Sequence, residues 1–156
     1  MKLYVMRHGH SPSTQEAGVT RDADRPLSDK GHADARAQAQ RLAEKGERPR
    51  LILHSPLRRA VETAREAAAV LGVEAREFEP LSNELGPDDL AERLSEPLKR
   101  SQDVLIVGHQ PQIGELSAWL CGQLVDFKPA GLAALELPDG PAPRRARLAW
   151  AAPPGV

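Results

Sequence analysis

The fold class of this chain is decided by residues 3–9, which read LYVMRHG. The unbroken apolar run over 3–6 is typical of a strand that is buried on both faces, as in a parallel sheet covered by helices. A basic pair, Arg7 and His8, follows directly and ends the strand. Because ligands bind beyond the carboxyl ends of the strands in open α/β sheets, Arg7 and His8 are candidates for a binding site.

Two more apolar runs, at 51–53 and 104–107, also lead into histidines, His54 and His109. The stretches between the runs carry apolar residues three and four positions apart, which is the spacing of helices that cover a sheet. The sequence therefore predicts helices over 28–45 with Ser28 as N-cap, after Pro56, around 90–94 with an end or kink at Pro97, and over 113–120 before Gly122.

The alternation of strands and helices predicts an α/β fold, with a single domain over 1–156 and a largely parallel central sheet covered on both faces. A weak strand is expected near 73–78. The late strands near 133–137 and 147–151 are expected to form an antiparallel edge. A chain of 156 residues is long enough for one domain with a real core and too short for two ordinary ones.

Charge and composition exclude several classes of function. The 21 basic and 22 acidic residues nearly balance, so the chain has no general attraction to nucleic acid or to an anionic membrane. Anion binding therefore requires a local basic cluster. No apolar stretch is long enough to span a membrane, and the single cysteine, Cys121, rules out a disulfide within the chain. These features predict a cytoplasmic protein.

Each of the three strong strands ends in arginine or histidine, within the segments MRHGH at 6–10, HSPLRRA at 54–60 and VGHQP at 107–111. Arginine offers a planar fork of donors that matches phosphate oxygens. A neutral imidazole nitrogen attacks phosphorus and forms a phosphohistidine, and a second histidine donates to an oxygen as charge develops. The combination predicts phosphoryl transfer, and neither a metal nor another cofactor is expected.

Other phosphate chemistries fit the sequence less well. His8 and His10 form an H-x-H pair, but a basic residue precedes it and no third metal ligand is obvious, which disfavours a metallohydrolase. A cysteine phosphatase needs arginine six residues after its nucleophile, and phenylalanine stands there after Cys121. Asp22 and Asp24 form a D-x-D pair in a polar loop, whereas an aspartate nucleophile needs that pair at a strand end.

Taken together, MRHG at 6–9, SPLRRA at 55–60 and VGH at 107–109 resemble the signature segments of the histidine phosphatase superfamily, which includes the phosphoglycerate mutases. The short length and the segment RPLS at 25–28 most resemble SixA-type phosphohistidine phosphatases. The similarity extends from Lys2 to about Trp150, and the motifs are specific in combination.

The resemblance implies a role for each matched residue. It makes His8 the phosphorylated nucleophile and His109 the second, non-nucleophilic histidine. Arg7 and Arg59 become the phosphate clamps. The family pattern places the second clamp immediately before alanine, which selects Arg59 over Arg58 and makes Arg58 a surface neighbour.

Two further positions, Glu84 and His10, lie near the motifs. Glu84, in LSNEL at 81–85, stands where many relatives carry a carboxylate that donates a proton to the leaving group. The alternative for Glu84 is a solvated or backbone-bonding loop residue. His10 stands where relatives often carry an acidic or other polar residue, and we expect it at the rim of the site.

The sequence favours phosphohistidine on a protein partner, such as a phosphotransfer domain, as the substrate. Relatives that act on small phosphates often carry a long insertion that closes over the substrate, whereas the segments 11–25 and 71–103 are short here. A small phosphate ester is the alternative substrate. A non-catalytic module that binds phosphorylated proteins is a minor alternative, because a pure binder would not need His8.

Overall fold

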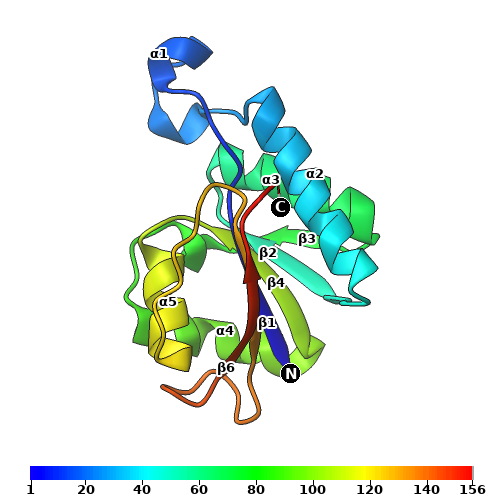
Figure 1. Cartoon of the computed structure of the whole chain (residues 1–156). Coiled ribbons are helices and arrows are strands. Elements are labelled where there is room, and N and C mark those ends of the chain that lie inside the picture. The colour runs from blue at the N-terminus through cyan, green and yellow to red at the C-terminus, as the bar shows by residue number, and fades with distance from the viewer. Residues whose placement is uncertain (156) are drawn as a thin grey trace.

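The computed structural model describes residues 1–155, and its centre is a six-stranded sheet in the order β3-β2-β4-β1-β5-β6 (Figure 1). The three apolar runs of the sequence form the neighbouring strands β2, β4 and β1, as predicted. The strands are β1 (Lys2–Arg7), β2 (Leu51–His54), β3 (Ala75–Glu77), β4 (Asp103–Gly108), β5 (Leu132–Glu136) and β6 (Arg147–Ala152).

Strands β1 to β4 pair in parallel, whereas β5 runs antiparallel to β1, and β6 runs antiparallel to β5. This arrangement confirms the predicted parallel sheet with an antiparallel edge. Parallel pairing brings the carboxyl ends of β1, β2 and β4 to one edge of the sheet. The segments that follow these strands therefore lie close together, although they are far apart in the chain.

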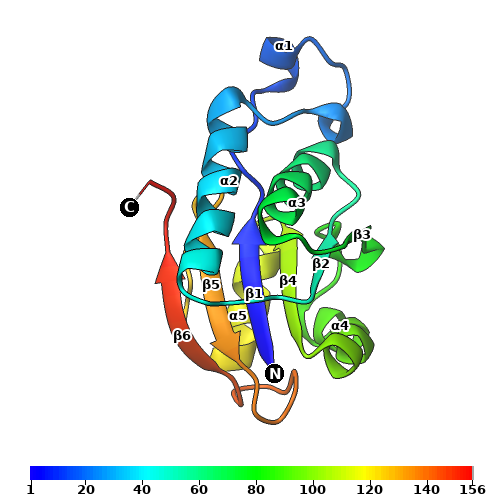
Figure 2. The same ribbon diagram turned by 90° about the vertical axis from the view of Figure 1, so that its right-hand side faces the viewer.

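Helices cover both faces of the sheet, as predicted (Figure 2). Successive residues of β1 point to opposite faces, so that Leu3 and Val5 pack into one core layer and Tyr4 and Met6 into the other. The first layer is covered by α4 (Pro87–Ser101) and α5 (Gln112–Cys121), and the second by α2 (Asp29–Glu44) and α3 (Arg58–Leu71).

Helix ends follow the local sequence, with one correction. The Ser28 side chain caps α2 by accepting a hydrogen bond from the Gly31 nitrogen, and Gly122 ends α5 in the left-handed conformation, as predicted. The sequence predicted an end or a kink at Pro97, and the end is wrong, because α4 continues to Ser101. Leu98, one residue beyond the proline, is fully buried and extends the apolar stripe of the helix against the sheet. That packing favours continuation.

Three short elements were not predicted from the sequence: α1 (Thr14–Ala17) and the 3-10 turns η1 (Asp22–Asp24) and η2 (Glu79–Leu81). The segment 11–25, which contains α1 and η1, lies beyond the carboxyl ends of the strands, with α1 at the top of the molecule in Figure 1. We refer to it as the rim segment. Within the described residues 1–155, no helix is both long and apolar enough to cross a membrane.

Candidate active site

The end of β1 is held from both sides. The Arg7 nitrogen donates to the carbonyl of Gly131, just before β5, and the His8 nitrogen donates to the carbonyl of Gly108 at the end of β4, each over 3.0 Å. The Ala130 nitrogen donates to the carbonyl of His8 over 2.9 Å. The backbone at His8 is therefore fixed on one side by Gly108 at the end of β4 and on the other by Ala130, just before β5.

The His8 ring is buried, and its Nδ1 lies 2.8 Å from the carbonyl oxygen of Gly9. A carbonyl oxygen only accepts hydrogen bonds, so Nδ1 carries the proton and Nε2 keeps its lone pair. The pKa of His8 is lowered to about 3, mainly by burial and also by the nearby His109, Arg59 and Arg7, while the hydrogen bond with Gly9 opposes this shift. At neutral pH the imidazole is uncharged, which is the form that attacks an electrophile.

The loop after His8 packs very closely against the start of α2. A Cβ atom at Gly9 would lie 2.7 Å from the carbonyl oxygen of Gly31, and a Cβ atom at Gly31 would overlap the carbonyl oxygen of His10. Both positions therefore require glycine. Thr63 on α3 holds the other side of this loop, since its hydroxyl accepts from the Gly9 nitrogen over 3.0 Å.

His109 follows β4 and faces His8, with the ring centroids 5.1 Å apart and the rings tilted by 53°. Its Nε2 lies 2.7 Å from the hydroxyl oxygen of Ser55, the residue that follows β2. The pKa of His109 is lowered to about 4, mainly by burial and also by Arg59 and Arg7, while the carboxylate of Asp22 opposes this shift. His109 is therefore neutral in the free protein as well.

Two buried nitrogens at this site lack hydrogen-bond partners. Among the buried side-chain nitrogen and oxygen atoms of the described residues, those that lack a hydrogen-bond partner are Arg7 Nε and His109 Nδ1. Arg7 is anchored by its Nη1, which donates to the carbonyl of Phe127 over 3.0 Å. If the Ser55 hydroxyl donates to His109 Nε2, the imidazole proton is on Nδ1. Both unpartnered nitrogens are then donors without an acceptor.

Arg59 is buried at the start of α3, and its charge lowers the pKa of both His8 and His109. Its Nη1 and Nη2 donate to the backbone carbonyl and the carboxylate of Asp22, each over 3.0 Å. Arg58, in contrast, is exposed and pairs with Glu62 over 3.0 Å. The structure thus places Arg59 among the histidines and directs Arg58 to the surface.

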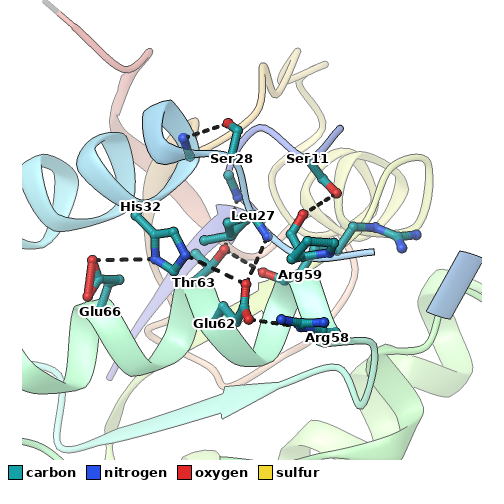
Figure 3. A network of polar contacts seen from close by, with 12 residues as sticks. Ser11, Leu27, Ser28, His32, Arg58, Arg59, Glu62, Thr63 and Glu66 are labelled. Atoms are coloured by element: carbon teal, nitrogen blue, oxygen red, sulfur yellow. Dashed lines mark hydrogen bonds and ion pairs between the residues drawn. The ribbon is translucent and has the colours of Figure 1, made fainter. Parts of the chain in front are cut away.

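Figure 3 shows why Arg58 and Arg59 point differently. Glu62 lies one turn along α3, where it accepts from Arg58 and from the backbone nitrogen of Leu27 and also faces His32. This carboxylate holds Arg58 on the outer side of the helix. The Thr63 hydroxyl donates to the carbonyl of Arg59 over 2.7 Å on the inner side.

Glu84 and His10 lie on the periphery. Glu84 is exposed, in the turn that follows η2. The neighbouring Asn83 fixes this turn beside His109, because its side chain donates to the carbonyl of Gln110 over 3.0 Å and accepts from the Gln112 nitrogen over 3.1 Å. His10 is exposed, and its Nδ1 lies 2.7 Å from the hydroxyl oxygen of Ser28.

The structure therefore brings Arg7, His8, Arg59 and His109 together at the carboxyl edge of the sheet. It also shows three residues to which the sequence analysis gave no role at this site: Ser55, Thr63 and Asp22. Ser55 lies inside the quoted SPLRRA segment, and Thr63 stands one helical turn after Arg59, so both carried a positional signal. Asp22 is separated from Arg59 by 37 positions and carried none.

Comparison with known proteins gives a consistent family assignment. The family model described as "Histidine phosphatase superfamily (branch 1)" matches residues 3–100. An uncharacterised protein of Picosynechococcus sp. is 36% identical over 143 residues, which cover 87% of this chain and 85% of that protein.

Solved structures share the fold. The protein histidine phosphatase SixA in complex with tungstate superposes with a TM-score of 0.86 at 24% identity, over 97% of this chain and 96% of that one. A mycobacterial glucosyl-3-phosphoglycerate phosphatase in complex with VO3 gives a TM-score of 0.72 at 21% identity, over 96% and 97% of the two chains.

Within residues 1–155, no group of three or more His, Cys, Asp or Glu side chains is arranged to hold a metal ion.

Proposed function

Because the chain belongs to the histidine phosphatase superfamily, branch 1, we propose that it is a phosphatase that forms a phosphohistidine intermediate at His8. The observation that carries this proposal is the pair of unpartnered nitrogens, Arg7 Nε and His109 Nδ1. Leaving a buried donor unpaired costs about 1–3 kcal/mol. A phosphoryl group in front of His8 would accept from both donors and remove that cost.

In the first step, the lone pair on His8 Nε2 attacks phosphorus. The bond from phosphorus to the leaving atom breaks, and its electron pair departs with that atom. The imidazole of His8 becomes positively charged and keeps its proton on Nδ1, where the carbonyl of Gly9 stabilises it. Arg7, Arg59 and His109 donate to the phosphoryl oxygens as charge develops on them.

In the second step, a water oxygen attacks the phosphorus of phospho-His8. The electron pair of the phosphorus–nitrogen bond returns to Nε2, inorganic phosphate forms, and the proton of the water leaves with phosphate or solvent. An ester substrate also needs a proton on its departing oxygen. Glu84 is the residue we propose for that transfer, in a turn that Asn83 fastens beside His109.

We propose that the enzyme works without a metal ion or other cofactor. Arg7 and Arg59 supply positive charge at the site, and His109 supplies a further donor. These groups perform the charge compensation for which many phosphatases use divalent cations.

For the substrate we propose phosphohistidine on a protein partner, in the cytoplasm. Two observations support this choice. The structure superposes better on SixA, named as a protein histidine phosphatase, than on the sugar-phosphate enzyme. The rim segment contains only a one-turn helix and a 3-10 turn, which leaves room for a side chain projecting from another protein. A small phosphate ester is the second candidate, because the same clamp accepts any terminal phosphate.

The experiment that tests this function combines trapping with a substrate panel. Rapid mixing with a phosphorus-labelled substrate, followed by alkaline denaturation, should leave the label on His8, stable in base and lost in acid. A protein that binds the phosphorylated partner and never takes up label would be a binding module instead. Comparison of kcat/KM for a phosphohistidine-bearing domain, phosphoglycerate, a sugar phosphate and a phosphoserine peptide then identifies the leaving group. A clear preference for a small metabolite would overturn the protein substrate and leave the His8 mechanism standing.

A further inference from the structure

Asp22 places a negative charge on one of the two phosphate clamps. Its carboxylate Oδ2 and its backbone carbonyl accept from the two terminal nitrogens of Arg59 over 3.0 Å each. The Arg59 side chain is only 10% exposed, whereas the Asp22 side chain is 61% exposed. The carboxylate therefore reaches the buried guanidinium from the solvent side, which is the side from which a substrate arrives.

The rest of the rim segment holds Asp22 in this position. Arg25 donates to the second carboxylate oxygen of Asp22 over 3.0 Å. The same guanidinium donates to the carbonyls of Pro12 over 2.7 Å and Ser11 over 3.1 Å. Arg25 thus ties the two ends of the rim segment together and fixes the carboxylate between two arginines.

The carboxylate is charged and close enough to His109 to affect its pKa. The hydrogen bond from Arg25, and next the contact with Arg59, hold the pKa of Asp22 below its usual range against the effect of burial. The negative charge of Asp22 in turn raises the pKa of His109 and so partly offsets the effect of burial. At neutral pH a full negative charge therefore stands beside the position that the phosphoryl group takes in the proposed function.

A guanidinium has five N–H donors, and Asp22 occupies two of them. Arg59 can therefore hold the carboxylate and a phosphoryl oxygen at the same time. Two anions that share one guanidinium lie roughly 5 Å apart, where their repulsion is substantial even with solvent screening. The site then binds a phosphoryl group less tightly than its arginines alone would allow.

We propose that Asp22 is a specificity-determining residue, which disfavours ligands with added negative charge and favours phosphoryl donors whose leaving group is neutral or cationic. This inference rests on the proposed function of the clamp. A phosphoimidazole that is protonated on its far ring nitrogen carries one positive charge more than a phosphate ester. Phosphoglycerate carries an additional carboxylate, and inorganic phosphate is the charged product that has to leave. The carboxylate would accelerate product release and select against small anionic metabolites.

The test uses the full chain and inorganic phosphate as the probe, measured by titration calorimetry, because binding of phosphate requires neither turnover nor a known substrate. Asp22→Asn removes the charge and keeps the shape and the backbone carbonyl. We expect it to bind phosphate about three- to tenfold more tightly than the unaltered protein, as estimated for one screened unit charge at this range. Asp24→Asn is the matched control, since Asp24 lies in the same 3-10 turn and pairs with the exposed Arg21 over 3.4 Å.

The results of the phosphate titration distinguish a failure of the Asp22 proposal from a failure of the proposed phosphatase function. Unchanged or weaker phosphate binding by Asp22→Asn would overturn the proposal, and weaker binding would show that Asp22 orients Arg59 instead. Equal tightening by both variants would also overturn it, because the effect would then be general charge. Absence of phosphate binding by both the unaltered protein and Asp22→Asn would contradict the clamp and the proposed function together.

A second measurement addresses the leaving group. In Asp22→Asn the ratio of kcat/KM for a phosphohistidine-bearing domain to that for phosphoglycerate should fall by about the same three- to tenfold. A ratio that stays constant while phosphate binding tightens would limit Asp22 to product release and overturn its role in substrate selection.

Discussion

The hydroxyl oxygen of Thr63 lies 3.0 Å from the backbone nitrogen of Gly9, although the two residues are 54 positions apart in the chain. The same hydroxyl donates to the carbonyl of Arg59 over 2.7 Å. The carbonyl of Gly9 in turn accepts from Nδ1 of His8. One hydroxyl therefore connects the loop after His8, the proposed nucleophile, with the helix turn that carries Arg59, a proposed phosphate clamp.

Thr63→Val keeps the shape of the side chain and removes both hydrogen bonds. We expect it to lower the free energy of unfolding by about 1–3 kcal/mol, because the Gly9 nitrogen loses its buried acceptor. We also expect kcat to fall about tenfold with a smaller change in KM, since the Gly9 peptide no longer fixes the His8 ring. Thr63→Ser should restore both quantities. Imidazole nitrogen chemical shifts would show whether the His8 proton still resides on Nδ1, and an unchanged kcat in Thr63→Val would contradict this role.

His8→Ala should abolish turnover and leave the fold intact, because it removes the proposed nucleophile while the backbone of His8 stays bonded to Gly108 of β4 and to Ala130, just before β5. The expected loss in kcat is about a thousandfold or more. Steady-state kinetics and a thermal melt of the same preparation measure the two effects. Turnover within about tenfold of the unaltered protein would exclude His8 as the nucleophile.

Arg59→Ala should reduce kcat/KM far more than Arg58→Ala, although the two residues are adjacent. Arg59 is buried beside both histidines, whereas Arg58 pairs with Glu62 on the surface. Loss of a charged donor in the transition state corresponds to about a hundredfold or more, and loss of an exposed ion pair to less than about tenfold. The reverse order would mean that Arg58 is the clamp.

Exhaustive treatment with EDTA should leave activity unchanged, because the proposed site compensates phosphate charge with Arg7, Arg59 and His109. The control is the same treatment applied to a known metal-dependent phosphatase. Loss of activity that returns only on addition of a divalent cation would favour the metallohydrolase instead.

The free energy of unfolding should fall as the pH drops below about 6.5. Burial holds the pKa of His8 at about 3 and that of His109 at about 4, well below the value of about 6.5 in an unfolded chain. Between these values the unfolded chain binds more protons, so each histidine contributes a loss of about 1.4 kcal/mol per pH unit. Urea titrations between pH 4 and 6.5 give the free energy of unfolding at each pH. This free energy should change less steeply with pH in His8→Asn than in the unaltered protein. Equal dependence on pH in the two proteins would contradict the lowered pKa of His8.

Much of the fold was predictable because the central strands carry unbroken apolar runs and the helices carry a three-four stripe. These patterns are local, and burial on two faces imposes them directly. The end of α4 was less predictable, because the local rule that proline ends or kinks a helix competed at Pro97 with the burial of Leu98, which depends on the tertiary structure.

Parts of the candidate site were predictable for a different reason. Arg7 ends β1, and His8 and His109 follow β1 and β4, whose carboxyl ends meet, so the topology alone brings them together. The contact between Asp22 and Arg59 joins an irregular loop to a helix across 37 positions, and no periodic pattern encodes it. The segment that anchors Arg7 through the carbonyl of Phe127 is 120 positions away and is irregular as well.

The end of β1 is bonded through its backbone to Gly131 on one side and to Gly108 on the other, and these bonds limit the local opening of the backbone. In deuterated water the backbone amide hydrogens of Arg7 and His8 should exchange only when the centre of the sheet opens, at close to the free energy of global unfolding. The rim segment is secured mainly by side chains such as Arg25 and should exchange through small local openings. Under the proposed function, His8 would therefore stay in place when a phosphorylated protein binds, and the residues around Asp22 would adjust to that protein.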